Sequence, residues 1–320
     1  MSDDTKYLSY GPSNVGDLLA TTLSKWASEN LEDQIFNAMP LYKKMYAKAK
    51  KQNGGATILL PVMYEKNNTV GWYSKYDSLD TTPQNGFTLT QGKWKNLSGS
   101  VSISGDDLAK NSGEAQIISL LDSYTMQAME SMRDEVSTSL FRTAPGSTQM
   151  TSLVTMIDAT STIQEVNSTN NSWWQSTVTS GGSFAAQGLD DMRTTRDTVE
   201  EYNPVSTIDT IVTTKAIKNY YEASLTPNIR YTPGGDGKPT FSSLMFGNAE
   251  IFSDPSATSG VIYMFSTDDL SLYINTNGEY RTTEFVKPSN QDAKVAQIIL
   301  RVELLTRARR KLAKISSVTA

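Results

Sequence analysis

The sequence predicts an α+β protein in which a long β-arm leads into a long helix and strands dominate the last part of the chain. Three observations support this fold class. Residues 56–104 carry two strand patterns separated by turn formers. Residues 114–141 carry a helical apolar pattern that neither Gly nor Pro interrupts. From Gly260 onward, short strand patterns follow one another as far as Leu304.

Residues 1–55 carry three helical patterns, the first of them over 15–26. The second, over 31–38, is expected to end before Pro40, and the third, over 41–51, is expected to end before Gly54-Gly55. Lysines make 43–51 basic, and we interpret this block as a solvated helix face, with a neighbour's acidic surface or a phosphate as the alternative. The first helix is predicted from apolar spacing at Val15, Leu18, Leu19, Thr22, Leu23 and Trp26, with Ser13 or Asn14 as its cap.

The arm is the most informative segment. Its first leg, 57–64, carries apolar side chains on both faces, whereas its second leg has one apolar and one polar face. A leg of about 20 residues would reach roughly 65 Å, and a two-stranded ribbon is marginal alone in water. We therefore expect the arm to be buried against another subunit. The apolar set of the second leg is Phe87, Leu89, Leu97, Val101 and Ile103, and the turn-rich tip carries Trp72, Tyr73 and Tyr76.

The remaining elements follow in order. Asn111 and Glu114 are predicted to form a capping box before the long helix, which would run roughly 40 Å. Residues 158–188 are predicted to be a surface loop in which Trp173-Trp174 anchors the loop or stacks on a sugar. Helix, strand and helix patterns over 189–221 indicate an α/β or α+β middle. Strands are predicted over 261–265, 270–274, 280–286 and 296–304, with a hairpin at Asn277-Gly278.

The composition disfavours an enzyme. The chain has 0 Cys and 0 His, which excludes Cys₂His₂ zinc sites, thiol nucleophiles and Ser-His or Cys-His mechanisms, and we expect no cofactor and no metal. A carboxylate-based glycosidase remains an alternative, but Asp190-Asp191 and Glu200-Glu201 are adjacent on predicted helix and would point apart. The Gly-rich stretch at 234–239 lacks P-loop spacing and is interpreted as a turn.

Charge and hydropathy limit the partners. The net charge is −5 with a pI near 5.0, so the basic residues over 307–314 do not predict tight DNA binding by the protein as a whole. Inter-subunit pairing with the acidic N-terminal region explains them equally well. A mean hydropathy of −0.39 and the lack of a long apolar run predict no membrane span. The first residues are acidic and do not resemble a secretion signal, so we expect synthesis in the cytoplasm.

The order and spacing of these segments resemble the major capsid protein of tailed bacteriophages, the Hong Kong 97-like fold. The likeness spans nearly the whole chain, although each short phrase is weak by itself. The phrases are Gly54-Gly55-Ala56-Thr57 and Pro61-Val62 where the chain enters the arm, Val101-Ser102-Ile103-Ser104-Gly105-Asp106 where it leaves the arm, Asn111-Ser112-Gly113, the run Lys287-Pro288-Ser289-Asn290-Gln291-Asp292-Ala293, and Arg309-Arg310.

The resemblance implies a domain plan. Residues 1–55 would be an N-terminal arm and 56–104 an extended β-loop that lies across an adjacent subunit. Residues 105–145, with the spine helix, and 270–320 would form the peripheral domain, and 146–269 the axial domain. Lys75, Lys93 and Lys95 lie in the loop where some members form Lys-Asn crosslinks, but no partner asparagine or acid can be matched, so no crosslink is assigned.

The resemblance also implies a function and its partners. Subunits would assemble into hexamers and pentamers of an icosahedral head enclosing double-stranded DNA, in the virion, with a separate scaffolding protein, a portal and only non-specific contact with DNA. A non-viral, encapsulin-like nanocompartment shell is the alternative with the same architecture. The residues expected at inter-subunit contacts are Trp26, Trp72, Tyr73, Tyr76 and Trp94, with packing inside the chain as the alternative role for Trp26 and Trp94.

Overall fold

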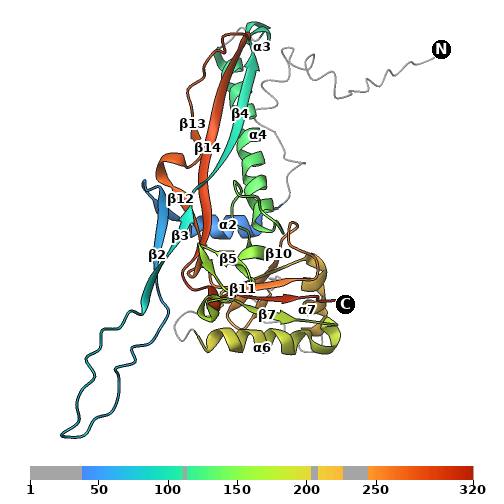
Figure 1. Cartoon of the computed structure of the whole chain (residues 1–320). Coiled ribbons are helices and arrows are strands. Elements are labelled where there is room, and N and C mark those ends of the chain that lie inside the picture. Colours follow the sequence, from blue (N-terminus) through green and yellow to red (C-terminus); the bar gives the residue numbers. More distant parts are fainter. Residues whose placement is uncertain (1–37, 111–113, 203–207, 226–243, 320) are drawn as a thin grey trace, which may run out of the picture. The chain divides into compact units, whose positions relative to one another are not determined.

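The computed structural model describes residues 38–110, 114–202, 208–225 and 244–319. These residues belong to two compact units. Among them, the first unit contains Leu97–Asp134 and Tyr280–Leu300, and the second contains the segments up to Asn96, Glu135–Glu279 and the chain from Arg301 onward. Figure 1 labels the elements of both units.

The first unit is built on antiparallel strands and a long helix. β14 (Ala293–Thr306) pairs with β4 (Lys95–Ser104) and with β13 (Arg281–Thr282), where Arg281 lies opposite Ile299. After β4 come α3 (Gly105–Lys110), which was not predicted, and α4 (Glu114–Leu140), the long helix that the apolar spacing predicted. Asn111 of the predicted capping box lies outside the described residues. Val101 and Ile103 are buried on β4, and Gly99 lies so close to Met132 of α4 that a Cβ would be 3.0 Å from its sulfur.

The second unit contains a six-stranded mixed sheet in the order β7-β15-β11-β8-β10-β9. β8 pairs in parallel with β10, and β15 pairs in parallel with β7, whereas β11 is antiparallel to both β8 and β15. Side chains of α6 and α7 join those of the sheet in one apolar core. The bounds are β7 (Thr177–Ser180), α6 (Leu189–Glu200), β8 (Thr210–Thr213), α7 (Lys215–Leu225), β9 (Met245–Phe246), β10 (Ala249–Ser253), β11 (Ile262–Phe265) and β15 (Ala313–Ser316).

Near the start of the described chain, the structure corrects one helix prediction, whereas the helix expected over 15–26 lies outside the described residues and the piece expected over 31–38 lies almost entirely outside them. Pro40 begins α2 (Pro40–Ala47), because a proline lacks only the N–H that the first helical turn leaves unpaired. Asp254 accepts a hydrogen bond from the Leu41 N–H in that turn, at 3.4 Å. The helix expected over 41–51 ends at Ala47, and β1 (Lys50–Gln52) pairs in parallel with β12 (Leu270–Asn275).

Two other predictions were also wrong. The 158–188 segment, predicted to be a surface loop, contains short strands and turns and includes β7, which pairs with β15 in the six-stranded sheet. The Asn277-Gly278 pair lies in a 3₁₀ turn, η6 (Thr276–Gly278), and β12 and β13 each pair with β14 instead of with each other. The elements of 153–188 are α5 (Leu153–Met156), β5 (Thr162–Ile163), β6 (Val166–Asn167), η3 (Ser172–Trp174), β7 and the π-helical turn η4 (Phe184–Gly188). The last turn of the chain, η7 (Arg309–Lys311), comes just before β15.

Candidate assembly surface

The arm is a short two-stranded ribbon with an extended tip (Figure 1). β2 (Thr57–Met63) and β3 (Phe87–Lys93) pair along seven residues each, with Leu60 opposite Thr90. The expectation of a second leg that continues in the same ribbon as far as Ser104 is wrong. The chain leaves the ribbon at Trp94, and β4 pairs with β14 in another sheet.

One face of the ribbon is buried in the second unit. Ile58 and Leu60 pack against Tyr273 and Leu305 in a small apolar cluster. Gly92 permits this approach, because a Cβ at that position would collide with the Leu305 side chain. The even-numbered positions of β2 and β3 therefore form the attachment face of the ribbon.

The other face of the ribbon is apolar and exposed. Leu59, Met63, Phe87 and Leu89 are 53%, 68%, 70% and 61% exposed, and Pro61 lies between them. The register places Met63 opposite Phe87 and Pro61 opposite Leu89. We call these five residues the outer face. Such a contiguous apolar surface is typical of a protein interaction site.

The outer face was missed because Phe87 and Leu89 were assigned to the same buried side as Val101 and Ile103. In β4 the buried residues Val101 and Ile103 are at odd positions, as predicted, whereas in β3 the odd positions Phe87 and Leu89 are exposed. The side that is buried changes where the strand changes sheet, at Trp94. Gly92, between polar neighbours at the end of the pattern, was the available signal for a close approach on the even face.

The tip, residues 64–86, holds itself together by local turns. The Thr69 N–H donates to the Asn67 side chain and the Thr82 N–H to the Asp80 side chain, as in Asx turns, and the Ser74 N–H donates to the Asp77 carboxylate. It contains no regular strand, and the residues from Val70 to Asn85 are all exposed. Trp72, Tyr73 and Tyr76 are among these exposed residues, Trp72 fully so, and the Lys75 ammonium lies 5.5 Å from the Tyr76 ring centre.

The other two predicted contact residues differ from these. Trp94 is partly buried against the attachment cluster, and its indole N–H donates to the Gly55 carbonyl at 3.0 Å. These contacts favour its alternative role, packing inside the chain. Trp26 lies outside the described residues.

The basic block contacts acidic groups of its own unit. Lys44 pairs with Glu250 at 3.2 Å, and Lys48 pairs with Asp209 at 3.2 Å. Burial alone would raise the pKa of Asp209, but hydrogen bonds from Thr267, Thr210 and Lys48 outweigh it and lower that pKa. Lys51 pairs with Glu279 at 2.7 Å. The ammonium groups of these lysines are therefore paired within the unit, which weakens their attraction for a neighbour's acidic surface or for a phosphate.

The basic residues at the end of the chain also have partners in the second unit. Lys311 pairs with Asp269 at 3.4 Å, Lys314 with Asp158 at 3.7 Å, and the Arg310 guanidinium lies 3.8 Å from the Tyr202 ring centre. Arg309 is fully buried and donates to the carbonyls of Met156, Asp158 and Ser161, at 2.9, 2.7 and 2.8 Å. Its burial lowers its pKa to about 10, which still leaves it charged at neutral pH.

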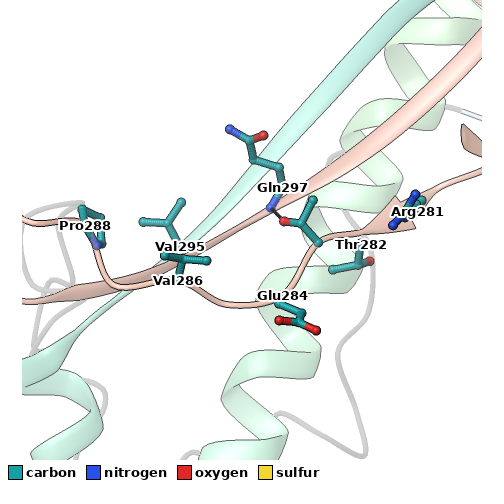
Figure 2. A pocket seen from close by; sticks show the side chains of 8 residues that line it. Arg281, Thr282, Glu284, Val286, Pro288, Val295 and Gln297 are labelled. Atoms are coloured by element: carbon teal, nitrogen blue, oxygen red, sulfur yellow. Dashed lines mark hydrogen bonds between the residues drawn. The ribbon is translucent and has the colours of Figure 1, made fainter.

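The first unit also contains a pocket with a mixed polar and apolar lining. It has a volume of about 680 Å³ and is lined by Arg281, Glu284, Val286 and neighbours (Figure 2). There the Gln297 N–H donates to the Thr283 hydroxyl at 2.9 Å, and one carboxylate faces a mixed lining. Asp190, nominated for glycosidase chemistry, pairs instead with Arg193 on its own helix, at 3.0 Å.

No group of three or more acidic side chains among the described residues is placed to hold a metal ion. No helix among them is long and apolar enough to cross a membrane.

Comparison with solved structures identifies the fold. The capsid asymmetric unit of cyanophage A-1(L) matches with a TM-score of 0.68 at 12% identity, covering 97% of this chain and 100% of that one. A structure from Mycobacterium phage Adephagia matches with 0.55 at 11% identity, covering 98% and 99%. The capsid of an empty GTA particle matches with 0.57 at 12% identity, covering 89% and 98%. No family model and no curated protein matches the chain.

These matches extend over nearly the whole of both chains, so they concern the complete arrangement of elements and not one shared motif. The chain has the α+β fold of phage capsid proteins, which confirms the predicted Hong Kong 97-like fold class. At such low identity the comparison establishes the fold, and the function is inferred from the surface described above.

Proposed function

We propose that the chain is the major capsid protein of a tailed bacteriophage and that it assembles into the hexamers and pentamers of an icosahedral head around double-stranded DNA. The observation that carries this proposal is the match to capsid structures over nearly the whole chain, combined with an arm whose apolar outer face is left exposed by the residues that the structure describes. The function is then structural and requires no catalytic group.

In this proposal the outer face and the tip are the contact surfaces between copies. Fully burying one Leu, Met or Phe side chain stabilises an association by about 1.5–3 kcal/mol, before the entropy of association is subtracted. Leu59, Met63, Phe87 and Leu89 would contribute in this way, and Trp72, Tyr73 and Tyr76 would add aromatic contacts at the tip. Each contact is modest, and the stability of the shell arises from their repetition.

The domain plan is part of the same proposal. Residues 1–55 serve as the N-terminal arm, 56–104 as the extended loop, 105–145 with 270–320 as the peripheral domain, and 146–269 as the axial domain. The short ribbon within 57–93 and the six-stranded sheet, built largely from residues within 177–265, support the loop and axial assignments.

The proposed partners are further copies of the chain, a separate scaffolding protein, a portal and packaged DNA, and the proposed location is the virion after synthesis in the host cytoplasm. Contact with DNA is non-specific and loose in this proposal. The ion pairs of Lys44, Lys48, Lys51, Lys311 and Lys314 inside the second unit support it, because paired ammonium groups attract phosphate less strongly than free ones.

The test is electron microscopy of a variant that lacks the tip. The Tyr64 N–H donates to the Gly86 carbonyl at 3.0 Å, so the two strands are already close where the tip begins. Replacing residues 66–85 by an Asn-Gly turn removes Trp72, Tyr73 and Tyr76 and keeps β2, β3 and the outer face. We expect shells or capsomers from the unmodified chain and only small soluble species from the variant.

The control is the unfolding transition of the variant, which should resemble that of the unmodified chain because the tip makes few contacts outside itself. A compact monomer from the unmodified chain at high concentration would contradict the proposal. Analysis of the contents of any shells separates a phage head from the nanocompartment alternative, since enzyme cargo in place of nucleic acid would favour the latter.

A further inference from the structure

The ribbon is fastened at a second place besides its attachment face. The Gln91 N–H donates to the Gln164 carbonyl at 3.2 Å, which adds the turn of the β5–β6 hairpin to the edge of β3. Glu165, in the same turn, pairs with Lys93 at 2.8 Å and also accepts a hydrogen bond from the Gln91 side chain. One short hairpin thus contacts β3 through the main chain and through two side chains.

A further contact lies just beyond the end of β2. The rings of Tyr64 and Trp173 have centres 5.4 Å apart, and Trp173 lies 5.6 Å from Trp174. Trp174 is buried, and its indole N–H donates to the Ile163 carbonyl at 3.2 Å, which connects η3 to the hairpin. The tryptophan pair therefore joins the tip side of the ribbon to the same segment that holds Gln91 and Lys93.

The hairpin itself rests on Arg309. The guanidinium donates to the carbonyls of Met156, Asp158 and Ser161, so it fixes the chain that leads into β5. In the hairpin turn, Gln164 and Glu165 have φ values of 52° and 65°, the left-handed conformation of a two-residue type I′ turn. Neither is a glycine, which indicates that the surrounding contacts hold the turn in place.

We propose that this segment is a latch that sets the direction in which the ribbon leaves the second unit, with Glu165 and Trp173 as positioning residues. The attachment face alone is a small cluster about which a two-stranded ribbon could pivot. Contacts at Lys93, Gln91 and Tyr64 are spread along the ribbon and oppose such a pivot. One part of the inference rests on the proposed function: in a shell, the direction of the arm would set the angle between neighbouring copies.

The test measures the ribbon direction in the full chain below the concentration at which shells form. The chain contains 0 Cys, so spin labels can be attached to two new cysteines, at Leu89→Cys on the outer face and Asp190→Cys on exposed α6. Both positions are in the second unit. Double electron-electron resonance spectroscopy then gives the distribution of distances between the two spin labels. In this background we expect one narrow distribution.

Three variants distinguish the latch from general stability. Glu165→Lys should broaden the distribution, because it places two cations together, and Lys93→Glu added to it should narrow the distribution again. Trp173→Ala should broaden it, and Trp173→Phe should keep it narrow because a ring remains over Tyr64. If Glu165 contributed only to general stability, adding Lys93→Glu to Glu165→Lys would not restore the narrow distance distribution.

The inference is overturned if Glu165→Lys and Trp173→Ala both leave the distance distribution unchanged, or if the charge exchange fails to restore it. Because the labels are read in unassembled protein, these outcomes do not depend on shell formation. Failure of the unmodified chain to form particles would refute the proposed function and leave the measured latch in place.

Discussion

At the scale of single residues, the most unusual side chain is Arg309, a cation with almost no solvent exposure. Its nearest acidic residue, Asp158, raises its pKa only enough to offset part of the effect of burial. Main-chain carbonyls supply most of its partners, together with the Ser161 hydroxyl. A planar guanidinium can reach several carbonyls at once, which the ammonium of a lysine cannot do.

We therefore expect Arg309→Met to lower the free energy of unfolding by about 3 kcal/mol, because it leaves buried carbonyls without donors. Arg309→Lys is the matched variant, and it should lose nearly as much since the fork of donors is missing. Urea unfolding of the unassembled protein measures both. Equal stability of the lysine variant and the unmodified chain would show that charge, and not the fork geometry, stabilises this segment.

Glu303 gives a prediction about pH. Burial raises the pKa of this carboxyl above its ordinary value of 4.5, although hydrogen bonds from the N–H groups of Thr151 and Leu304, at 2.9 and 3.0 Å, and the charge of Lys95 act the other way. A raised pKa in the folded state means that the bound proton stabilises the fold. That contribution is complete below pH 4.5 and is lost as the pH rises through the folded pKa.

Compared with Glu303→Gln, which accepts the same two hydrogen bonds at every pH, the unmodified chain should gain free energy of unfolding as the pH falls from 7 toward 4.5. Urea titrations of both proteins at several pH values in that window measure the difference. A difference that stays constant, or that changes in the opposite sense, contradicts the assignment of a raised pKa to this group.

The environment of a residue was predictable where local chemistry decides it, and it was not predictable where tertiary contacts decide it. Tip aromatics interleaved with Asn, Asp and Gly were expected in turns, and the tip has no regular strand. Phe87 and Leu89 were expected on a buried face, since alternation shows that two faces differ but not which of them meets the core. Contacts with residues distant in sequence decide that, among them the close approach of Gly92 to Leu305.

At the scale of elements, the ribbon offers a matched pair of substitutions. Leu59 and Leu60 are adjacent in β2 and point to opposite faces, with exposures of 53% and 3%. Leu60→Ala should lower the free energy of unfolding by about 3 kcal/mol, because it leaves a cavity beside Tyr273 and Leu305. Leu59→Ala should change it by less than about 0.5 kcal/mol.

The same pair should behave differently in assembly. Leu59→Ala should reduce the yield of particles although the subunit remains folded, because it removes apolar surface from the outer face. Sedimentation of both variants alongside urea unfolding separates the two effects. If Leu59→Ala assembles as well as the unmodified chain at every concentration, the outer face is not an assembly contact.

Helices were easier to predict than strand partners. The apolar spacing over 114–141 and 189–199 gave helices within one or two residues of α4 and α6, because a helix satisfies its hydrogen bonds locally. Strand partners lie far away in sequence, so a strand pattern does not identify its sheet. For that reason the change of sheet at Trp94 and the pairing of β12 and β13 with β14 were not predicted.

At the scale of the whole molecule, the proposed assembly is driven by apolar surface more than by charge. We expect shells to form less readily at 4 °C than at 25 °C, since burial of apolar surface stabilises less at low temperature, and to form more readily in sulfate. Sedimentation of the purified chain under these conditions measures the effect. Loss of shells in moderate salt without any effect of temperature would indicate that ion pairs between copies dominate instead.

The overall fold was predictable because many weak signals occur in one order, and the assembly surface was predictable only as a segment. The sequence indicated that residues 56–104 need a neighbour, whereas the structure shows which side of the ribbon is available. Intrachain ion pairs of the basic block and of the last turn could not be foreseen, because they depend on the positions of Asp209, Glu250 and Asp269 in three dimensions.

The hydrogen bond between Tyr64 and Gly86 gives the loop a closed neck. Beyond that neck, the turns depend on their own side chains and not on the strands below. We therefore expect that the tip can be lengthened, shortened or exchanged for a foreign peptide without disturbing the register of the ribbon. In the proposed assembly, a change in the tip would alter the contacts with neighbouring copies and leave the ribbon and its attachment face as they are.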